Sequence, residues 1–186
     1  GQGAARKVVV LKVAQVQDFA RAERLWVVLA AAARGSGDQA GLQQALGERA
    51  LLMINRSNNG TDASVLAEAG ALLAEQEAIC RAAGNRAGLA QAVGNRAIVQ
   101  RYLGDLPGAL ASLDEQLGLV RESGDAQGTL IATANRGEVL GLLGRVPEAL
   151  EALTWARQTA AQYGLTPMVQ QLDAMIANLR SGGGLR

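Results

Sequence analysis

The chain has 186 residues, a formal net charge of +1, no histidine and one cysteine. Its 18 basic and 17 acidic residues form no extended basic run, so the sequence lacks the electrostatic footprint of a nucleic-acid binder. A single cysteine excludes an intramolecular disulfide framework and a zinc site built from several cysteines.

Composition also predicts the fold class. Hydrophobic residues make up 49% of the chain but aromatic residues only 3%, so alanine, leucine and valine must fill the core. Alanine and leucine are strong helix formers, and runs of β-branched residues are scarce. We therefore expect an all-α protein, in which Cys80 is a packed core thiol rather than a reactive one.

The first predicted unit spans residues 4–36 and follows a flexible end at residues 1–3. Its first helix is expected from Val8 to Val16. This apolar run is too short to cross a membrane, and no cleavage pattern follows it. We therefore expect a cytoplasmic protein with no membrane partner.

The second predicted unit, residues 37–83, is longer than the units that follow. The distance from its opening glycine to Gly84 is 47 residues, seven more than the later period of 40. The extra length falls in the polar segment 58–62, which predicts either an extended loop between the two helices or a lengthened second helix. Thr61 or Asp62 is expected to cap that second helix.

The third and fourth predicted units, residues 84–123 and 124–163, repeat most closely. Gly84, Gly124 and Gly164 fall at equal spacings of 40 residues. A Gly-x-x-Pro turn joins the two helices of each unit, at residues 104–107 and 144–147. Glycine suits the left-handed end of one helix, and proline suits the first turn of the next. A period of this size indicates a solenoid of helical hairpins.

The last predicted helix, residues 164–180, has no partner helix after it and is expected to cap the core, with a flexible end at 181–186. In the second helix of each unit, small and large apolar residues are expected to recur at fixed positions. The small position holds Ala22, Ala109 and Ala149, and the large one holds Trp26, Leu113 and Leu153.

The recurring pattern Asn-Arg-small residue, followed by a turn glycine and then by alanine and leucine, resembles the tetratricopeptide repeat in its roughly forty-residue variant. It is similar to the repeats of kinesin light chains, of spindle-orientation adaptors and of large bacterial signalling proteins. The resemblance covers about residues 4–180 and is strongest over 84–163. It implies an α-solenoid of about four helical hairpins with a C-terminal capping helix, built as a single array.

In arrays of this family the first helices line the inner surface, so the resemblance implies a groove on those helices. It would bind a peptide or helix of a partner protein, with neither a cofactor nor a metal. Residues of mixed character in this groove predict an amphipathic ligand. The predicted groove residues are Gln44, Glu48, Leu51, Asn55, Gln91, Asn95, Ile98, Arg101, Tyr102, Ile131, Asn135, Glu138 and Leu142, completed by Met175 and Asn178.

Two polar positions recur in the first helices. Asn95 and Asn135 share one position, where similar asparagines of the family's adaptors form a ladder along bound peptides. A carboxamide both donates and accepts hydrogen bonds, so it can hold a peptide backbone of any sequence. The alternative is that these asparagines bond neighbouring helices within the array.

Arginine occupies the next position, at Arg49, Arg96 and Arg136. These residues could form a basic stripe for phosphate or for an acidic peptide. We favour a structural role, in which the aliphatic stem lies on the core and the guanidinium finds a carboxylate, with Asp114 as a candidate partner.

The position before the asparagines argues against one known mode of peptide capture. Relatives that hold the C-terminal tails of chaperones have basic residues there, whereas this chain has Gly47, Gly94 and Ala134. Capture of chaperone tails is therefore not expected.

Catalysis is not expected either. The chain has no histidine, the commonest catalytic base. Glu75 and Glu77 are two residues apart in a predicted helix and so point to different sides. The leading hypothesis is a protein-interaction module. One alternative is a regulatory or sensor segment of a larger bacterial signalling protein or transcriptional regulator, and a second is a scaffold that self-associates through its open edges.

Overall fold

The computed structural model describes residues 19–57 and 60–185, which form eight α-helices and no strand. The helices are α2 (Phe19–Ser36), α3 (Gln39–Arg56), α4 (Ala63–Ala83), α5 (Arg86–Tyr102), α6 (Leu106–Glu122), α7 (Ala126–Leu142), α8 (Val146–Gln162) and α9 (Thr166–Arg180). The all-α prediction is confirmed. The predicted helix from Val8 to Val16 and the predicted end at 1–3 lie outside the described residues.

The chain divides into two compact units, Gly1–Leu103 and Gly104–Arg186. The first contains α2 to α5 and the second contains α6 to α9. The boundary falls inside the predicted unit 84–123, between its two helices. That the four predicted helical hairpins and the capping helix form a single array stays a prediction.

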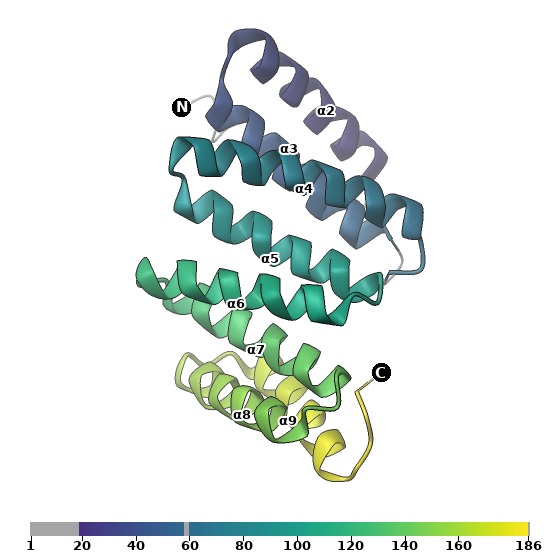
Figure 1. Ribbon diagram of the computed structural model, residues 1–186, viewed down its shortest axis with the longest axis vertical. Helices are drawn as coiled ribbons and strands as arrows, with labels where there is room; N and C mark the ends of the chain where they lie inside the picture. The colour runs from purple at the N-terminus through teal and green to yellow at the C-terminus, as the bar shows by residue number, and fades with distance from the viewer. Residues whose placement is uncertain (1–18, 58–59, 186) are drawn as a thin grey trace. The chain divides into compact units, whose positions relative to one another are not determined.

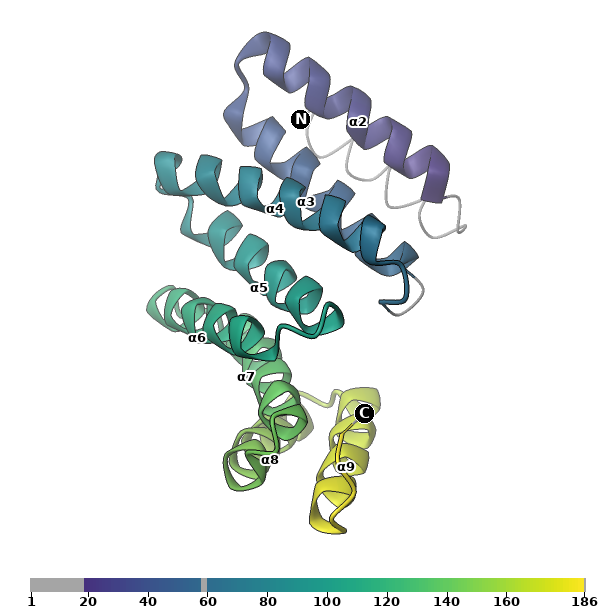
Figure 2. The same cartoon turned by 45° about the vertical axis from the view of Figure 1, so that its right-hand side comes forward.

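Within each unit, every helix packs against the next one in the chain. Alternate helices also touch, since α3 contacts α5 in the first unit and α7 contacts α9 in the second. Figure 1 and Figure 2 show α3 between α2 and α4, with α5 following α4. This pairwise order is the solenoid-like arrangement expected of repeated helical hairpins.

The glycines that revealed the period have the backbone conformation that only glycine adopts at low cost. Gly84, Gly124 and Gly164 have φ angles of +64°, +70° and +69°, and a side chain in this region would crowd the following carbonyl. Pro107 and Pro147 lie in the first turns of α6 and α8, as the sequence predicts.

A second recurring device begins the helices. The N-cap side chain of α3, α5, α6 and α7 accepts a hydrogen bond from the backbone N–H three residues later, and that residue is always a glycine. At Gly41 and at Gly128 an added Cβ would lie 2.3 Å from the capping aspartate. The glycine therefore makes room for the cap. The four pairs are Asp38–Gly41, Asn85–Gly88, Asp105–Gly108 and Asp125–Gly128.

The seven-residue insertion lengthens both the loop and the second helix of its unit. Helix α4 has 21 residues, whereas α6 and α8 have 17 each. Asp62 is the N-cap of α4 and accepts a hydrogen bond from the Val65 N–H. Hydrogen bonds from the Ser64 hydroxyl and the Val65 N–H lower the pKa of Asp62. Of the two predicted caps, Asp62 is therefore the one used.

The predicted register of the second helices is confirmed by burial. Both apolar positions are buried in the core in α2, α6 and α8. The small position holds Ala22, Ala109 and Ala149, each fully buried, and the large one holds Trp26, Leu113 and Leu153, each at least 97% buried. Cys80 is also buried, and burial together with the nearby Glu77 charge raises the pKa of its thiol. The prediction of a packed core thiol is confirmed.

The C-terminal segment makes a contact that the expectation of a flexible end did not include. Leu185 packs against the apolar core of the second unit. It covers Gly141, where an added Cβ would lie 2.5 Å from Cδ1 of Leu185. Gly141 therefore provides the space that the leucine side chain fills.

Candidate functional site

The predicted groove residues divide between the two compact units. Nine of them lie in the first unit, on α3 and α5, which contact each other, and four lie on α7 of the second unit. None of the thirteen is fully buried. Asn55, Gln91 and Ile131 are exposed, and the other ten are half-buried. Of the two completing residues on α9, Met175 packs partly into the core and Asn178 is exposed.

Asn95 and Asn135 are half-buried and keep their carboxamides free of internal bonds. Among the described residues, neither side chain makes a hydrogen bond. The amide nitrogen of Asn95 is itself buried without an acceptor. A buried donor without a partner is uncommon, because leaving it unsatisfied costs about 1–3 kcal/mol. The alternative role, bonding to neighbouring helices, has no such bond to support it.

The next repeat position is occupied by arginine, at Arg49, Arg96 and Arg136. Each of these side chains reaches a carboxylate on the helix that precedes its own. Arg96 on α5 lies 2.5 Å from the Glu77 carboxylate on α4, and Arg136 on α7 lies 2.6 Å from Asp114 on α6. The structural role is confirmed, including the expected partner Asp114. A further ion pair joins α8 to α9, with the arginine now on the earlier helix. Arg157 on α8 lies 2.9 Å from Asp173 on α9.

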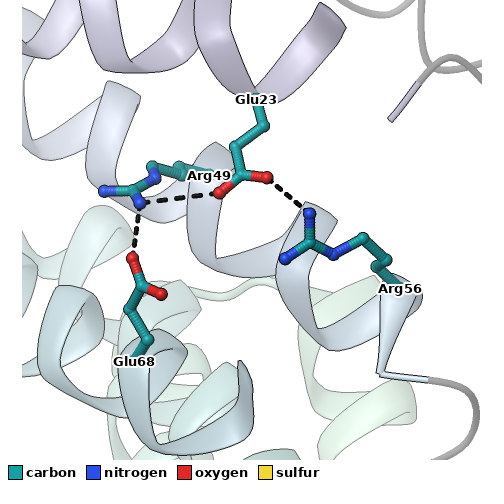
Figure 3. A network of polar contacts seen from close by, with 4 residues as sticks. All are labelled: Glu23, Arg49, Arg56 and Glu68. Atoms are coloured by element: carbon teal, nitrogen blue, oxygen red, sulfur yellow. Dashed lines mark hydrogen bonds and ion pairs between the residues drawn. The ribbon is translucent and has the colours of Figure 1, made fainter. Parts of the chain in front are cut away.

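Arg49 belongs to a larger network that spans three helices (Figure 3). Glu23 on α2 accepts from Arg56 at 2.8 Å through one carboxylate oxygen and from Arg49 at 3.5 Å through the other. Arg49 also donates to Glu68 on α4 at 2.5 Å. The arginine position therefore ties α3 both to the helix before it and to the helix after it.

Part of the predicted groove in the first unit is engaged internally. Ile98 and Tyr102 pack against the apolar cluster that α3 and α4 share with α5. The Tyr102 ring covers Gly60 in the inserted loop, where an added Cβ would lie 2.4 Å from Cδ1 of the ring. The Arg101 guanidinium lies 4.5 Å from the centroid of the same ring. These side chains close the end of α5 against the inserted loop.

The second compact unit, Gly104–Arg186, contains a groove that was not predicted from the sequence. A cavity of about 660 Å³ lies among α6, α7 and α8, lined in part by Gly118, Thr133, Glu151 and Trp155. A second cavity of about 500 Å³ shares Trp155 with it and continues toward the end of α8. The one local signal for this groove is Gly118, a glycine in the interior of α6.

Both signs of charge line this groove, and most of the charges are paired. Asp114 binds Arg136, as described above, and Glu148 accepts two hydrogen bonds from Arg145, which lower the pKa of Glu148. Glu151 and Arg121 also line the groove, and neither has an ion-pair partner within the described residues.

No family model matches the chain, and the curated proteins searched include no match. The described part of the chain contains no group of three or more cysteine, aspartate or glutamate side chains placed to hold a metal ion. Within that part, every helix is too short or too polar to cross a membrane.

Proposed function

We propose that this chain is an array of tetratricopeptide-like hairpins that binds a segment of a partner protein, and that the first-helix asparagines hold the backbone of that segment. The solenoid-like packing of the helices supports the array, and the side-by-side placement of α3 and α5 supports a shared binding face. Surfaces of this kind commonly serve recognition in helical repeats.

The observation that carries the proposal is the contrast between two adjacent repeat positions. Arg96 and Arg136 are fully engaged with carboxylates of the array. Asn95 and Asn135, one residue earlier, have no hydrogen-bond partner among the described residues. A structural asparagine would be expected to have such a partner. The amide nitrogen of Asn95 is buried, so a ligand backbone would bond the carboxamide oxygen of Asn95.

The face around Asn95 favours a ligand of mixed character. Half-buried Leu51 and exposed Gln91 lie on the same pair of helices, together with the carboxylate of Glu48. Each hydrogen bond to a ligand contributes about 0.5–1.5 kcal/mol, so the asparagines position the peptide, and apolar burial must add to its affinity.

The test begins with peptides selected on the full chain from a displayed random library. The affinity of the best peptide is then measured by calorimetry for the wild type and for the double variant Asn95→Ala/Asn135→Ala. Each lost hydrogen bond is expected to weaken binding about two- to tenfold.

The matched control is Gln170→Ala, which removes an exposed carboxamide from α9 and is expected to leave the affinity unchanged. Circular dichroism establishes that all variants are folded. A folded double variant that binds the peptide as tightly as the wild type would exclude the asparagine ladder.

A further inference from the structure

The groove in the second unit is built by equivalent faces of two helices. On α6, Asp114, Gly118 and Arg121 are spaced four and three residues apart, and on α8, Glu148, Ala152 and Trp155 have the same spacing. Residues at this spacing share one face of a helix. Helix α7 contacts both α6 and α8 and forms the floor.

Gly118 keeps this groove open without a structural need for glycine. Its φ is not in the left-handed region, and an added Cβ would meet no atom within 4 Å. By contrast, Gly137 in α7 packs directly on the Leu153 side chain, with 2.7 Å between an added Cβ and Cγ. Glycine in a helix interior costs about 0.5–1 kcal/mol relative to alanine. The empty space at Gly118 is therefore retained at a cost.

The floor of the groove contains an unpartnered polar group. Thr133 lines the cavity, its residue is only 8% exposed, and its hydroxyl has no hydrogen-bond partner in the described chain. A helical threonine ordinarily satisfies its hydroxyl on the carbonyl four residues earlier. This hydroxyl is itself buried, so it marks a polar floor beneath the groove.

The unpaired charges and the exposed aromatic ring indicate which chemical groups a ligand of this groove would carry. Glu151 and Arg121 have opposite signs, and neither is neutralised by the described residues. Trp155 lies one turn after Glu151 on the same face, and its indole is 43% exposed. An indole face attracts a cation, above all the planar guanidinium of arginine.

We propose that this groove binds an extended peptide segment of a partner protein that carries both a basic and an acidic side chain. The basic side chain lies between the Trp155 ring and the Glu151 carboxylate, and the acidic one pairs with Arg121. Residues two apart in an extended strand point to the same side, so an Arg-x-Glu segment presents both charges to the groove. The site uses α6, α8 and Thr133 of α7, whereas the proposed asparagine ladder uses Asn95 of α5 and Asn135 of α7, so the two proposals rest on different side chains and are tested separately.

The test uses Trp155 as its reporter, because the chain's other tryptophan, Trp26, is 97% buried in the first unit. The probe is the capped peptide acetyl-Ala-Arg-Ala-Glu-Ala-amide, titrated at low ionic strength. We expect a saturable change in tryptophan emission that is absent from Trp155→Phe. Replacing either charged residue of the peptide by glutamine should weaken binding about two- to fivefold.

Two variants at one position locate the site. Gly118→Leu fills the groove from a position where an added Cβ meets no atom within 4 Å, and it should reduce affinity by about tenfold or more. Gly118→Ala adds one carbon at the same place and should bind within about twofold of the wild type. Two further peptides keep only the arginine or only the glutamate. The charge reversal Glu151→Lys should reverse which of these two peptides binds more tightly.

Three results would overturn the proposal: no saturable signal, equal binding of the glutamine peptides, or unchanged binding by folded Gly118→Leu. The variant Asn95→Ala/Asn135→Ala separates the two sites. This double variant should leave the Trp155 emission change unchanged. Loss of that emission change in the double variant would assign the binding to the first-helix asparagines instead.

Discussion

At the residue scale, the adjacent asparagine and arginine of each first helix differ because neighbouring helical residues point about 100° apart. Arg96 therefore reaches Glu77 on the preceding helix, whereas Asn95 beside it reaches no partner among residues 19–57 and 60–185. The repeat placed the arginines against the preceding helix, and their ion pairs confirm that role, whereas peptide contact by the asparagines was implied by the family resemblance and stays a prediction. The repeat could not predict that the amide nitrogen of Asn95 is buried, because that depends on side chains from several helices.

The ion pairs at the arginine position are expected to differ in strength with the burial of the carboxylate. Arg96→Ala leaves Glu77, whose side chain is 9% exposed, with the longer 3.6 Å contact to Arg81, and should destabilise the protein by about 1–3 kcal/mol. Arg136→Ala frees Asp114, which is about half exposed, and should cost less than about 1 kcal/mol. Urea unfolding of both variants measures the difference, and equal losses would contradict it.

The cap of α4 is expected to make part of the stability depend on pH. The folded pKa of Asp62 is lowered, so its contribution is complete above the ordinary aspartate pKa of about 3.9 and is lost as the pH falls through the lower folded value. Asp62→Ala should lower the urea midpoint at neutral pH. Asp62→Asn retains the acceptor and should lose less, with a weaker acid dependence. Identical acid profiles for wild type and Asp62→Asn would refute this assignment.

At the scale of single elements, glycines of the same helix–turn segment have opposite consequences for stability. Gly124 ends that segment with φ +70°, so Gly124→Ala should cost about 1–2 kcal/mol. Gly118 lies in the interior of α6 beside open space, so Gly118→Ala should stabilise by up to about 1 kcal/mol. Thermal unfolding of the two variants provides the measurement, and shifts of the same sign would be inconsistent with the turn geometry.

The elements that could be predicted are those that depend on local chemistry. Turn glycines and first-turn prolines follow from a residue's own backbone preference, and hydrogen-bonding capacity narrowed the cap of α4 to Thr61 or Asp62. The groove among α6, α7 and α8 could not be predicted in this way, because it is a space left between side chains of three helices. Gly118 carried a signal for it, but a mid-helix glycine alone does not say whether packing or an opening requires it.

At the scale of the whole molecule, the described helices belong to two compact units with separate apolar cores. The first unit has two clusters around α3, and the second has one cluster around Leu153. In a repeat protein each hairpin is stabilised chiefly by its neighbours, so a core defect is expected to spread no further than adjacent hairpins. The period predicted the repeated hairpins as a single array, and it did not predict the boundary after Leu103.

This organisation predicts how a core mutation propagates. Leu153→Ala removes a fully buried side chain and should destabilise the second unit by about 2–5 kcal/mol. Hydrogen exchange followed by mass spectrometry should then be faster in α7, α8 and α9 and unchanged in α2 and α3. Equal acceleration across all helices would indicate that the chain unfolds as one cooperative body.

Asn95 and Asn135, which make no hydrogen bond to the described residues, are expected to bind a partner's backbone. The most direct test of this proposal is to follow the side-chain amide resonances of both residues by NMR, assigned from their alanine variants, while a selected peptide is added to the isotope-labelled chain. Asn85 is the control, because its carboxamide already accepts the Gly88 N–H at the start of α5. The predicted result is a saturable shift of both the Asn95 and Asn135 amide signals with Asn85 unmoved. Peptide binding that leaves both signals where they were would show that the two asparagines do not hold the peptide.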